Sequence, residues 1–428
     1  MSSPSTLSPL SINGDRLARR IAELAEVGAI PDGGVCRLAL TDDDRLGRDL
    51  VATWMRDLGM RIDIDGLGNV VGTWPADRFD PPVMTGSHID TVRTGGRFDG
   101  NYGVLAGLEV IETVIESGIV PSRPLAVAFF TGEEGARFAP DMIGSLAFVG
   151  GMSLEEALDT VAIDGAVLGD ELERIGYRGA MPCPTTPPSS FVELHVEQGP
   201  SLEIDSVTIG AVTGVQGILW QEFVISGQSN HAGTTPMGMR RDPAYVAAEV
   251  AVAVRRIANE IGGAQVGTVG RVELHPNLIN VIPARATFTV DLRNTDADQL
   301  LRAELSVAAL IAEIAERENV TVESRVLARF EPVEFDDRVV QLVEAAARER
   351  GQSVYRMPSG AGHDAQMLAR VCPAAMIFVP SVDGISHNPA EYTSDADIEA
   401  GANVLLDVML TLTDSELSPL PEPNEDFS

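Results

Sequence analysis

The stretch GSHIDTVRTGGRFDG, residues 86–100, combines a histidine and two aspartates with a glycine-rich backbone. The apolar, strand-like segment PPVMTGSH runs directly into it, and the helix-like segment GVLAGLEVIETVIESG, residues 103–118, follows it. A buried strand, a polar loop and a helix in succession are typical of an open α/β sheet, in which ligands bind beyond the carboxyl ends of the strands. We therefore predict an α/β fold with a functional site at this strand end.

The same alternation of helix-like and strand-like segments extends along most of the chain, but one internal region differs. From about residue 213 to residue 329 the expected elements follow the order β-α-β-β-α-β, which is that of a ferredoxin-like unit. Its first helix is marked by Asp242 as N-cap and Pro243 at the first helical position. We expect an inserted domain, residues 213–329, between two parts of a first domain, residues 1–212 and 330–428, and a disordered tail, residues 415–428.

The composition limits the partners and the chemistry. The 428 residues carry a net charge of −32 at pH 7, which disfavours nucleic acid and anionic membranes as partners, since both attract positive surfaces. All 31 basic residues are arginine, and the lack of lysine excludes Schiff-base catalysis, a P-loop lysine, a Cys-Glu-Lys amidase triad and a metal pair bridged by a carboxylated lysine. The three cysteines lack the spacing of a disulfide framework or a thiolate metal site. Because the N-terminus does not resemble a signal peptide and no apolar run is long enough to cross a membrane, we expect a cytoplasmic protein.

Five of the six histidines lie in polar, Gly/Pro-rich or strand-terminal segments, which favours a set of ligands over scattered structural residues. These are His88, His195, His231, His363 and His387. His275 lacks such neighbours and is expected to be structural. Asp90 follows His88 by two residues, so we expect its carboxylate to accept the second N–H of that imidazole. Asp99 lies beyond a glycine-rich turn, and its two oxygens suit it to bridge two cations.

Glu133 and Glu134 form a second acidic feature, directly after a buried-strand run. Adjacent carboxylates repel each other unless a positive charge lies close by, and a pair of metal ions would supply it. In that interpretation one glutamate binds metal and the other acts as a general base toward water. The alternative is a pair of solvated glutamates at the start of a helix.

Together these motifs resemble the M20-type metallohydrolases. The resemblance covers about residues 15–412 and rests on GSHIDTV, GGRFDGNYGVLAGLEV, FTGEEGARF, ELHVEQGP, NHAGTTPM, NVIPARATFTVDLRN, SGAGHD and SHNPAEYT. It is strongest with the hydantoinase/carbamoylase branch, which includes N-carbamoyl-L-amino acid hydrolases, β-ureidopropionases and allantoate amidohydrolases. His195 favours this branch, because the related peptidases commonly have a carboxylate at that position. One departure is Gly132, where many relatives have asparagine.

The resemblance implies a mixed-sheet catalytic domain with two metal ions, interrupted by a ferredoxin-like insert that acts as a lid and forms a homodimer. The implied metal ligands are His88, Asp99, Glu134, His195 and His387, with Asp99 shared by both ions. Glu133 is the implied general base, and Asp90 the implied partner of His88. The implied substrate contacts are Gln198, His231, Asn280, Arg293 and Gly362.

Side-chain chemistry supports two of these roles. The guanidinium of Arg293 could hold a substrate carboxylate through two parallel hydrogen bonds. His231 could stabilise a developing oxyanion, a contribution of about 3 kcal/mol per donor. The alternatives are a surface ion pair for Arg293 and a loop position without chemistry for His231.

The expected reaction is hydrolysis of a linear carbon–nitrogen amide, foremost the ureido group of an N-carbamoyl-L-amino acid. Mixed histidine and carboxylate ligands suit two divalent ions of zinc, manganese, cobalt or nickel. The expected partner is a small carboxylate-bearing substrate. The alternatives are an allantoate amidohydrolase or β-ureidopropionase with the same metal ligands, an M20-type dipeptidase or aminoacylase, and a metal-free binding protein.

Overall fold

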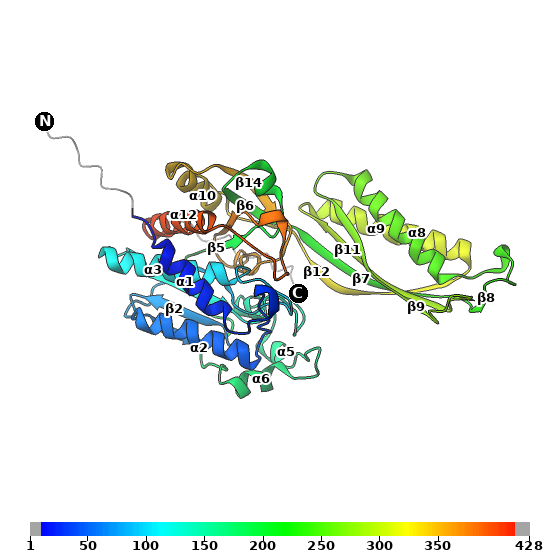
Figure 1. The fold of residues 1–428 in the computed structure, drawn as a ribbon, viewed down its shortest axis with the longest axis horizontal. Coiled ribbons are helices and arrows are strands. Elements are labelled where there is room, and N and C mark those ends of the chain that lie inside the picture. The colour runs from blue at the N-terminus through cyan, green and yellow to red at the C-terminus, as the bar shows by residue number, and fades with distance from the viewer. Residues whose placement is uncertain (1–9, 416–428) are drawn as a thin grey trace. The chain divides into compact units, whose positions relative to one another are not determined.

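The computed structural model describes residues 10–415, which form two units (Figure 1). The first unit contains the described residues up to Gly214 and from Glu334 onward, and the second unit contains Val215–Val333. Disorder is predicted for residues 415–428, and residues 416–428 lie outside the described residues. The chain therefore consists of a first unit in two segments, with the second unit inserted between them.

The first unit is built on a nine-stranded mixed sheet with the order β1-β2-β4-β3-β5-β15-β6-β13, in which β14 also pairs with β6. The strands β4, β3, β5 and β15 are parallel to one another, and the pairs β1/β2, β2/β4 and β15/β6 are antiparallel. The parallel strands are buried along their whole length, which explains their unbroken apolar sequences. The strands are β1 (Arg61–Ile64), β2 (Val70–Trp74), β3 (Val83–His88), β4 (Leu125–Phe130), β5 (Ser190–Val196), β6 (Ile209–Val215), β13 (Val333–Glu334), β14 (Val354–Ser359) and β15 (Ala374–Val379).

Helices pack against this sheet, and α3 and α12 contact both each other and the central strands. The helix expected over residues 103–118 is confirmed as α3, which ends at Gly118 in the left-handed conformation that glycine adopts at little cost. The helices are α1 (Gly14–Ala25), α2 (Asp42–Asp57), α3 (Asn101–Ser117), α4 (Ile143–Phe148), α5 (Leu154–Leu158), α6 (Leu168–Ile175), α7 (Ser201–Asp205), α10 (Asp337–Glu349), α11 (Asp364–Leu368) and α12 (Asp395–Asp414). Short 3₁₀ turns occur at η1 (Pro31–Gly33) and η3 (Val382–Gly384).

The second unit confirms the predicted order β-α-β-β-α-β. Its elements are β7 (Gly217–Ser226), α8 (Pro243–Ile261), β9 (Val266–His275), β11 (Arg285–Asn294), α9 (Ala297–Glu318) and β12 (Thr321–Phe330). The four strands form an antiparallel sheet in the order β12-β7-β11-β9. A short ribbon of β8 (Asn230–His231) and β10 (Val281–Ile282) and a 3₁₀ turn, η2 (Met237–Met239), complete this unit.

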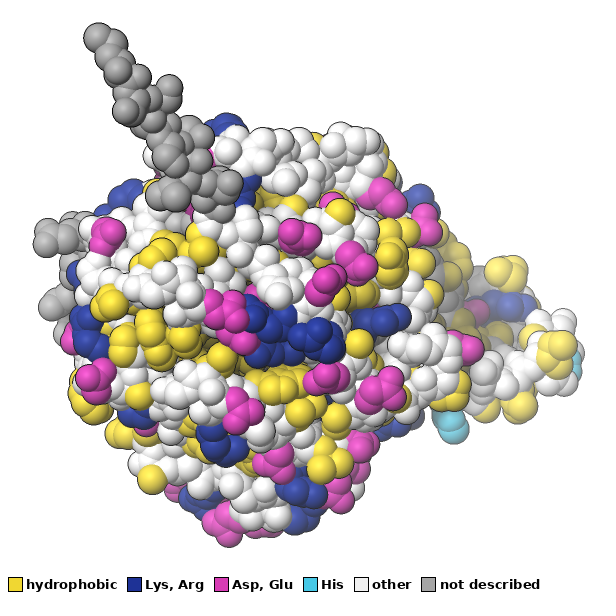
Figure 2. Space-filling view, turned by 60° about the vertical axis from the view of Figure 1, so that its left-hand side comes forward, with side chains coloured by type: hydrophobic (Ala, Val, Ile, Leu, Met, Phe, Trp, Pro, Cys, Tyr) yellow, Lys and Arg dark blue, Asp and Glu magenta, His cyan; other side chains and the backbone are white. Residues whose placement is uncertain are grey.

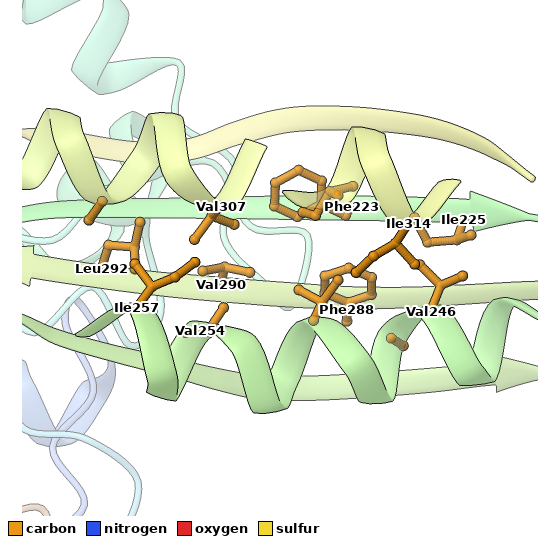
Figure 3. Close-up of a cluster of buried hydrophobic side chains, with 14 of the residues drawn as sticks. Phe223, Ile225, Val246, Val254, Ile257, Phe288, Val290, Leu292, Val307 and Ile314 are labelled. Carbon is orange, nitrogen blue, oxygen red and sulfur yellow. The ribbon is translucent and has the colours of Figure 1, made fainter. Parts of the chain in front are cut away.

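The core of the second unit lies between its two helices and one face of its sheet (Figure 3). Alternate residues of β11 are buried and include Phe288, Val290 and Leu292, as expected for a strand with one covered face. Asp242 caps α8 as predicted, because its Oδ1 accepts hydrogen bonds from the first backbone N–H groups of the helix. Both helices direct apolar side chains onto the sheet, so the insert has a hydrophobic core of its own.

Side chains of both charges are interspersed on the face of the molecule shown in Figure 2. Several arginines there and elsewhere join neighbouring elements, as Arg16 of α1 does through a 2.7 Å contact with Glu109 of α3. None of the helices within residues 10–415 is both long and apolar enough to span a membrane.

Candidate metal centre

His88 is the last residue of β3 and is buried. Its Nδ1 lies 2.9 Å from the backbone carbonyl of Asp90, so its Nε2 is free to point into the site. The sequence had suggested that the carboxylate of Asp90 holds this ring, and that expectation is wrong, because the chain turns after His88 and brings the carbonyl to the imidazole instead. The Asp90 carboxylate accepts the backbone N–H of Glu133 at 3.4 Å. Burial raises the pKa of Asp90 to about 7.

Asp99 directs its two carboxylate oxygens toward different histidines. Its Oδ1 lies 3.2 Å from Nε2 of His195 and 3.7 Å from Nε2 of His88, and its Oδ2 lies 3.4 Å from Nε2 of His387. Burial disfavours the charged carboxylate, but the hydrogen bonds with His195 and His387 outweigh it and hold the pKa of Asp99 well below its usual range. Gly100 follows with φ +65°, which starts α3 directly after the site.

Glu133 and Glu134 follow β4 after Gly132, whose φ is +68°. Glycine and asparagine both adopt this left-handed conformation readily, so glycine preserves the turn at this position. Oε2 of Glu133 lies 3.3 Å from Nε2 of His88, and Oε2 of Glu134 lies 3.2 Å from Nε2 of His387. Both pKa values are raised, primarily by burial and then by neighbouring carboxylates.

His195 and His387 complete the cluster. Nδ1 of His195 lies 2.8 Å from the carbonyl of Val196, which turns Nε2 toward Asp99. Burial lowers the pKa of His195, but the hydrogen bond to Asp99 and the negative charges of Asp99 and Glu193 together outweigh it and raise the value to about 9. The hydrogen bonds from His387 to Asp99 and Glu134 raise its pKa to about 11. The backbone of His387 is left-handed, with φ 55°, and such strain in a non-glycine residue is often found at functional sites.

The cluster contains two groups of three potential metal ligands that share Asp99. Within each group the ligand atoms lie within 4.8 Å of one another. The two groups are His88, Asp99 and His195, and Asp99, Glu134 and His387. In the part of the chain from residue 10 to residue 415, no arginine forms an ion pair with the carboxylates of this cluster, so their negative charge faces imidazoles and one another. This donor set fits two divalent cations that share one carboxylate.

A third group of potential ligands, Glu193, His195 and His363, differs from the first two. The oxygens of Glu193 accept hydrogen bonds from Ser87 Oγ at 2.6 Å and from the backbone N–H of Ala365 at 2.7 Å. Nε2 of His363 lies 2.9 Å from Ser359 Oγ, and its ring packs edge-on against His195 with 4.6 Å between centroids. Glu193 and His363 are therefore hydrogen-bonded within the protein, and the ring of His363 packs against that of His195. The sequence had assigned no role to His363.

Three comparisons with known proteins bear on this site. The family model described as peptidase family M20/M25/M40 matches residues 84–411. The chain belongs to this family.

Several relatives with similar sequences are amidohydrolases by name. The chain is 41% identical over 410 residues to an N-carbamoyl-L-amino acid amidohydrolase of Geobacillus stearothermophilus, covering 95% of this chain and 100% of the relative. It is 36% identical over 392 residues to an allantoate amidohydrolase of Bacillus subtilis, covering 91% and 95% of the two chains. The crystal structure of a hydantoinase/carbamoylase family amidase from Burkholderia multivorans superposes with a TM-score of 0.90 at 45% identity, covering 96% of this chain and 100% of the other.

Of the substrate contacts that the M20 resemblance implies, Gln198 and Gly362 lie in the first unit. Gln198 Nε2 donates to Oδ2 of Asp99 at 2.9 Å, so this side chain lies in the metal cluster. Its Oε1 is buried and has no hydrogen-bond partner among the described residues, which leaves an acceptor for a ligand. Gly362 precedes α11, and a Cβ there would come within 3.0 Å of Met142. The structure therefore brings Gln198 to the candidate metal ligands and places Gly362 beside the end of the Met142 side chain.

The remaining implied substrate contacts belong to the second unit. His231 and Asn280 lie together at the β8/β10 ribbon, where the Ala232 N–H donates to the Asn280 carbonyl at 3.0 Å. Nδ1 of His231 accepts backbone N–H groups from Gly233 and Thr234 at 3.0 and 3.2 Å, so a neutral ring carries its proton on Nε2.

Arg293 is paired within the protein. Its Nη2 and Nε lie 3.0 and 3.1 Å from the two carboxylate oxygens of Asp291, which is two residues away on β11. Its guanidinium also lies 6.0 Å from the ring of Trp220. A carboxylate bound by Arg293 must therefore share the guanidinium with Asp291.

Three residues of the metal cluster were quoted within sequence motifs but given no role. Asp364 begins α11, and after burial its charge is the largest cause of the raised pKa of Glu133. Ser386 donates to Asp99 Oδ2 at 3.1 Å. Glu391 accepts the backbone N–H groups of Phe98 and Asp99. Each lies within five residues of a histidine in the same motif, and this proximity could have indicated from the sequence that the residue belongs to the site.

Proposed function

We propose that the protein hydrolyses the ureido group of an N-carbamoyl-L-amino acid, releasing carbon dioxide, ammonia and the free amino acid. The observation that carries the proposal is the pair of ligand groups that share Asp99, with the carboxylate of Glu133 beside them. A relative 41% identical over nearly the whole chain is named for this activity. The histidine at position 195 supports an amidohydrolase over a dipeptidase or aminoacylase.

Two divalent metal ions are the proposed cofactors, and zinc, manganese, cobalt and nickel all suit the donors. We assign His88, Asp99 and His195 to one ion and Asp99, Glu134 and His387 to the other. When bound, the ions supply Lewis acidity, which polarises the carbonyl group of the substrate and acidifies water.

Glu133 is the proposed general base. Its carboxylate is buried and close to Nε2 of His88, and its raised pKa equips it to accept a proton from water. The oxygen of that water adds to the ureido carbonyl carbon, and Glu133 then passes the proton to the amino-acid nitrogen as the bond between that nitrogen and the carbonyl carbon breaks. The resulting carbamic acid decomposes to carbon dioxide and ammonia. Asp90 positions Glu133 by accepting its backbone N–H, in place of the predicted contact with His88.

The groups that hold the substrate are proposed to be Gln198, His231, Asn280, Arg293 and Gly362. The proton on Nε2 of His231 suits it to donate to a developing oxyanion. Arg293 would bind the substrate carboxylate in competition with Asp291. A homodimer formed through the second unit and a cytoplasmic location complete the proposal.

Allantoate hydrolysis is the second candidate function, because a relative 36% identical to the chain is named allantoate amidohydrolase. β-Ureidopropionase activity would use the same metal ligands. A substrate panel separates them: N-carbamoyl-α-amino acids, N-carbamoyl-β-alanine, allantoate, and N-acyl and dipeptide controls, each assayed with added manganese. Fastest turnover of an N-carbamoyl-α-amino acid supports the proposal, and fastest turnover of any other compound refutes it. A protein that binds no divalent ion and turns over none of them would be a binding protein.

A further inference from the structure

Two of the loops that meet at the candidate metal centre come from the two separate chain segments of the first unit. Asp99 lies in the loop after β3, and His387 lies in the loop before α12. His387 is the more weakly held of the two, since about half of its side chain is exposed and its backbone is left-handed. Some other contact must fix the distance between these loops if both residues are to bind the same ion.

Glu391 makes this contact. It follows His387 by four residues, its side chain is 4% exposed, and its Oε1 accepts the backbone N–H groups of Phe98 at 3.0 Å and Asp99 at 3.1 Å. The loop around Asp99 packs so closely here that a Cβ at Gly96 would overlap the Glu391 carboxylate.

The second oxygen of Glu391 extends the connection. Oε2 lies 3.4 Å from the hydroxyl of Ser386, and that hydroxyl also donates to Oδ2 of Asp99 at 3.1 Å. Oδ2 is the oxygen that faces His387. One carboxylate therefore holds the backbone of the bridging residue and, through Ser386, orients its side chain.

We infer that Glu391 is a positioning residue for the ion held by Asp99, Glu134 and His387, and that it acts as a hydrogen-bond acceptor rather than as a ligand. The inference rests on the proposed two-metal function. A glutamine can replace it, because the amide oxygen still accepts both N–H groups and the amide nitrogen donates to Ser386. An alanine leaves two buried N–H groups without their acceptor, and an aspartate is one methylene too short to reach them.

The test counts metal ions. Wild type, Glu391→Gln, Glu391→Asp and Glu391→Ala are loaded with Zn²⁺, dialysed, and measured for zinc per chain and for the affinity of each ion by titration. We expect two ions in wild type and in Glu391→Gln, and at least tenfold weaker binding of one of the two in the Asp and Ala variants. The Asp variant keeps the test valid if the Ala variant does not fold.

A matched control comes from the second unit. Oδ1 of Asp242 also accepts two backbone N–H groups, from Ala244 and Tyr245. Asp242→Ala should lower the thermal stability and leave the zinc content at the wild-type value. Wild-type affinity for both ions in folded Glu391→Asp and Glu391→Ala, or loss of an ion in Glu391→Gln, would overturn the inference. A wild-type chain that binds two ions but hydrolyses nothing in the substrate panel would refute the proposed function and leave this inference intact.

Discussion

Replacing Gly100 by alanine should strongly weaken metal binding at His88 while the chain remains folded. A Cβ at this position would lie less than 3.0 Å from three atoms of the His88 ring, whereas carbon atoms in contact prefer about 3.5–4.0 Å. The ring must therefore move by roughly 1 Å, and metal–ligand distances tolerate deviations of only about 0.2 Å. Mutation of a residue that only hydrogen-bonds to a metal ligand lowers metal affinity about 10–100-fold. Displacing the ligand itself should therefore lower the affinity by at least about 100-fold.

The alanine also carries a backbone cost, so the control places alanine at another glycine with positive φ. Gly100 has φ +65° and ψ −51°, outside the left-handed helical region, and such a sparsely populated backbone conformation costs an L-residue about 1–3 kcal/mol. Gly118, at the other end of the same helix, has φ +73°, and nothing lies within 4 Å of the place that a Cβ would take there. Gly118→Ala therefore places a Cβ at positive φ in the same helix without the clash, at the cost of the left-handed helical conformation, about 1–2 kcal/mol. Titration of the metal-free proteins with Zn²⁺ should show weak binding in Gly100→Ala alone. Equal affinities in both variants, or equal losses, would refute the steric reasoning.

Three further predictions concern the chemistry of the site. Glu133→Gln should keep both metal ions and lose 10²–10⁴-fold in turnover, because the general base is removed; a loss of metal in elemental analysis would make Glu133 a ligand instead. Metal affinity should rise with pH between pH 6 and pH 8, because the pKa values of His195 and His387 are raised to about 9 and about 11 without metal and each imidazole must lose a proton to bind a metal ion. Titrations in buffers of different ionisation enthalpy measure the protons released on binding. A metal affinity that does not change with pH would contradict the prediction. Arg293→Ala should raise KM about 10–100-fold for substrates with a free carboxylate, since a hydrogen bond to a charged group contributes about 1.5–3 kcal/mol. The KM for an uncharged amide should stay unchanged. An equal increase in KM for both substrates would exclude a role of Arg293 in binding the carboxylate.

The residues of the candidate metal site could be named from the sequence because each lies in a short motif that resembles one of the M20-type metallohydrolases. His88 ends one buried strand and Glu133 follows another; these strands pair in parallel, and parallel neighbours place their carboxyl ends at the same edge of the sheet. The order of elements in the second unit was predictable as well, since each helix and strand has a clear hydrophobic period.

The contacts between side chains were less predictable. Whether His88 meets the carboxylate or the carbonyl of Asp90 depends on the path of the chain after the strand, which no spacing encodes. Glu391 lies 292 residues from Asp99, so its acceptor role needs the folded loops. The pairing of Asp291 with Arg293 was accessible, because residues two apart on a strand share a face.

The central claim is that two cations share the carboxylate of Asp99. Anomalous diffraction from crystals of the zinc-loaded protein, recorded on both sides of the zinc absorption edge, tests it directly. We predict two anomalous peaks, each about 2.0–2.2 Å from a different oxygen of Asp99. A single peak, or two peaks of which one lies away from Asp99, would contradict the account.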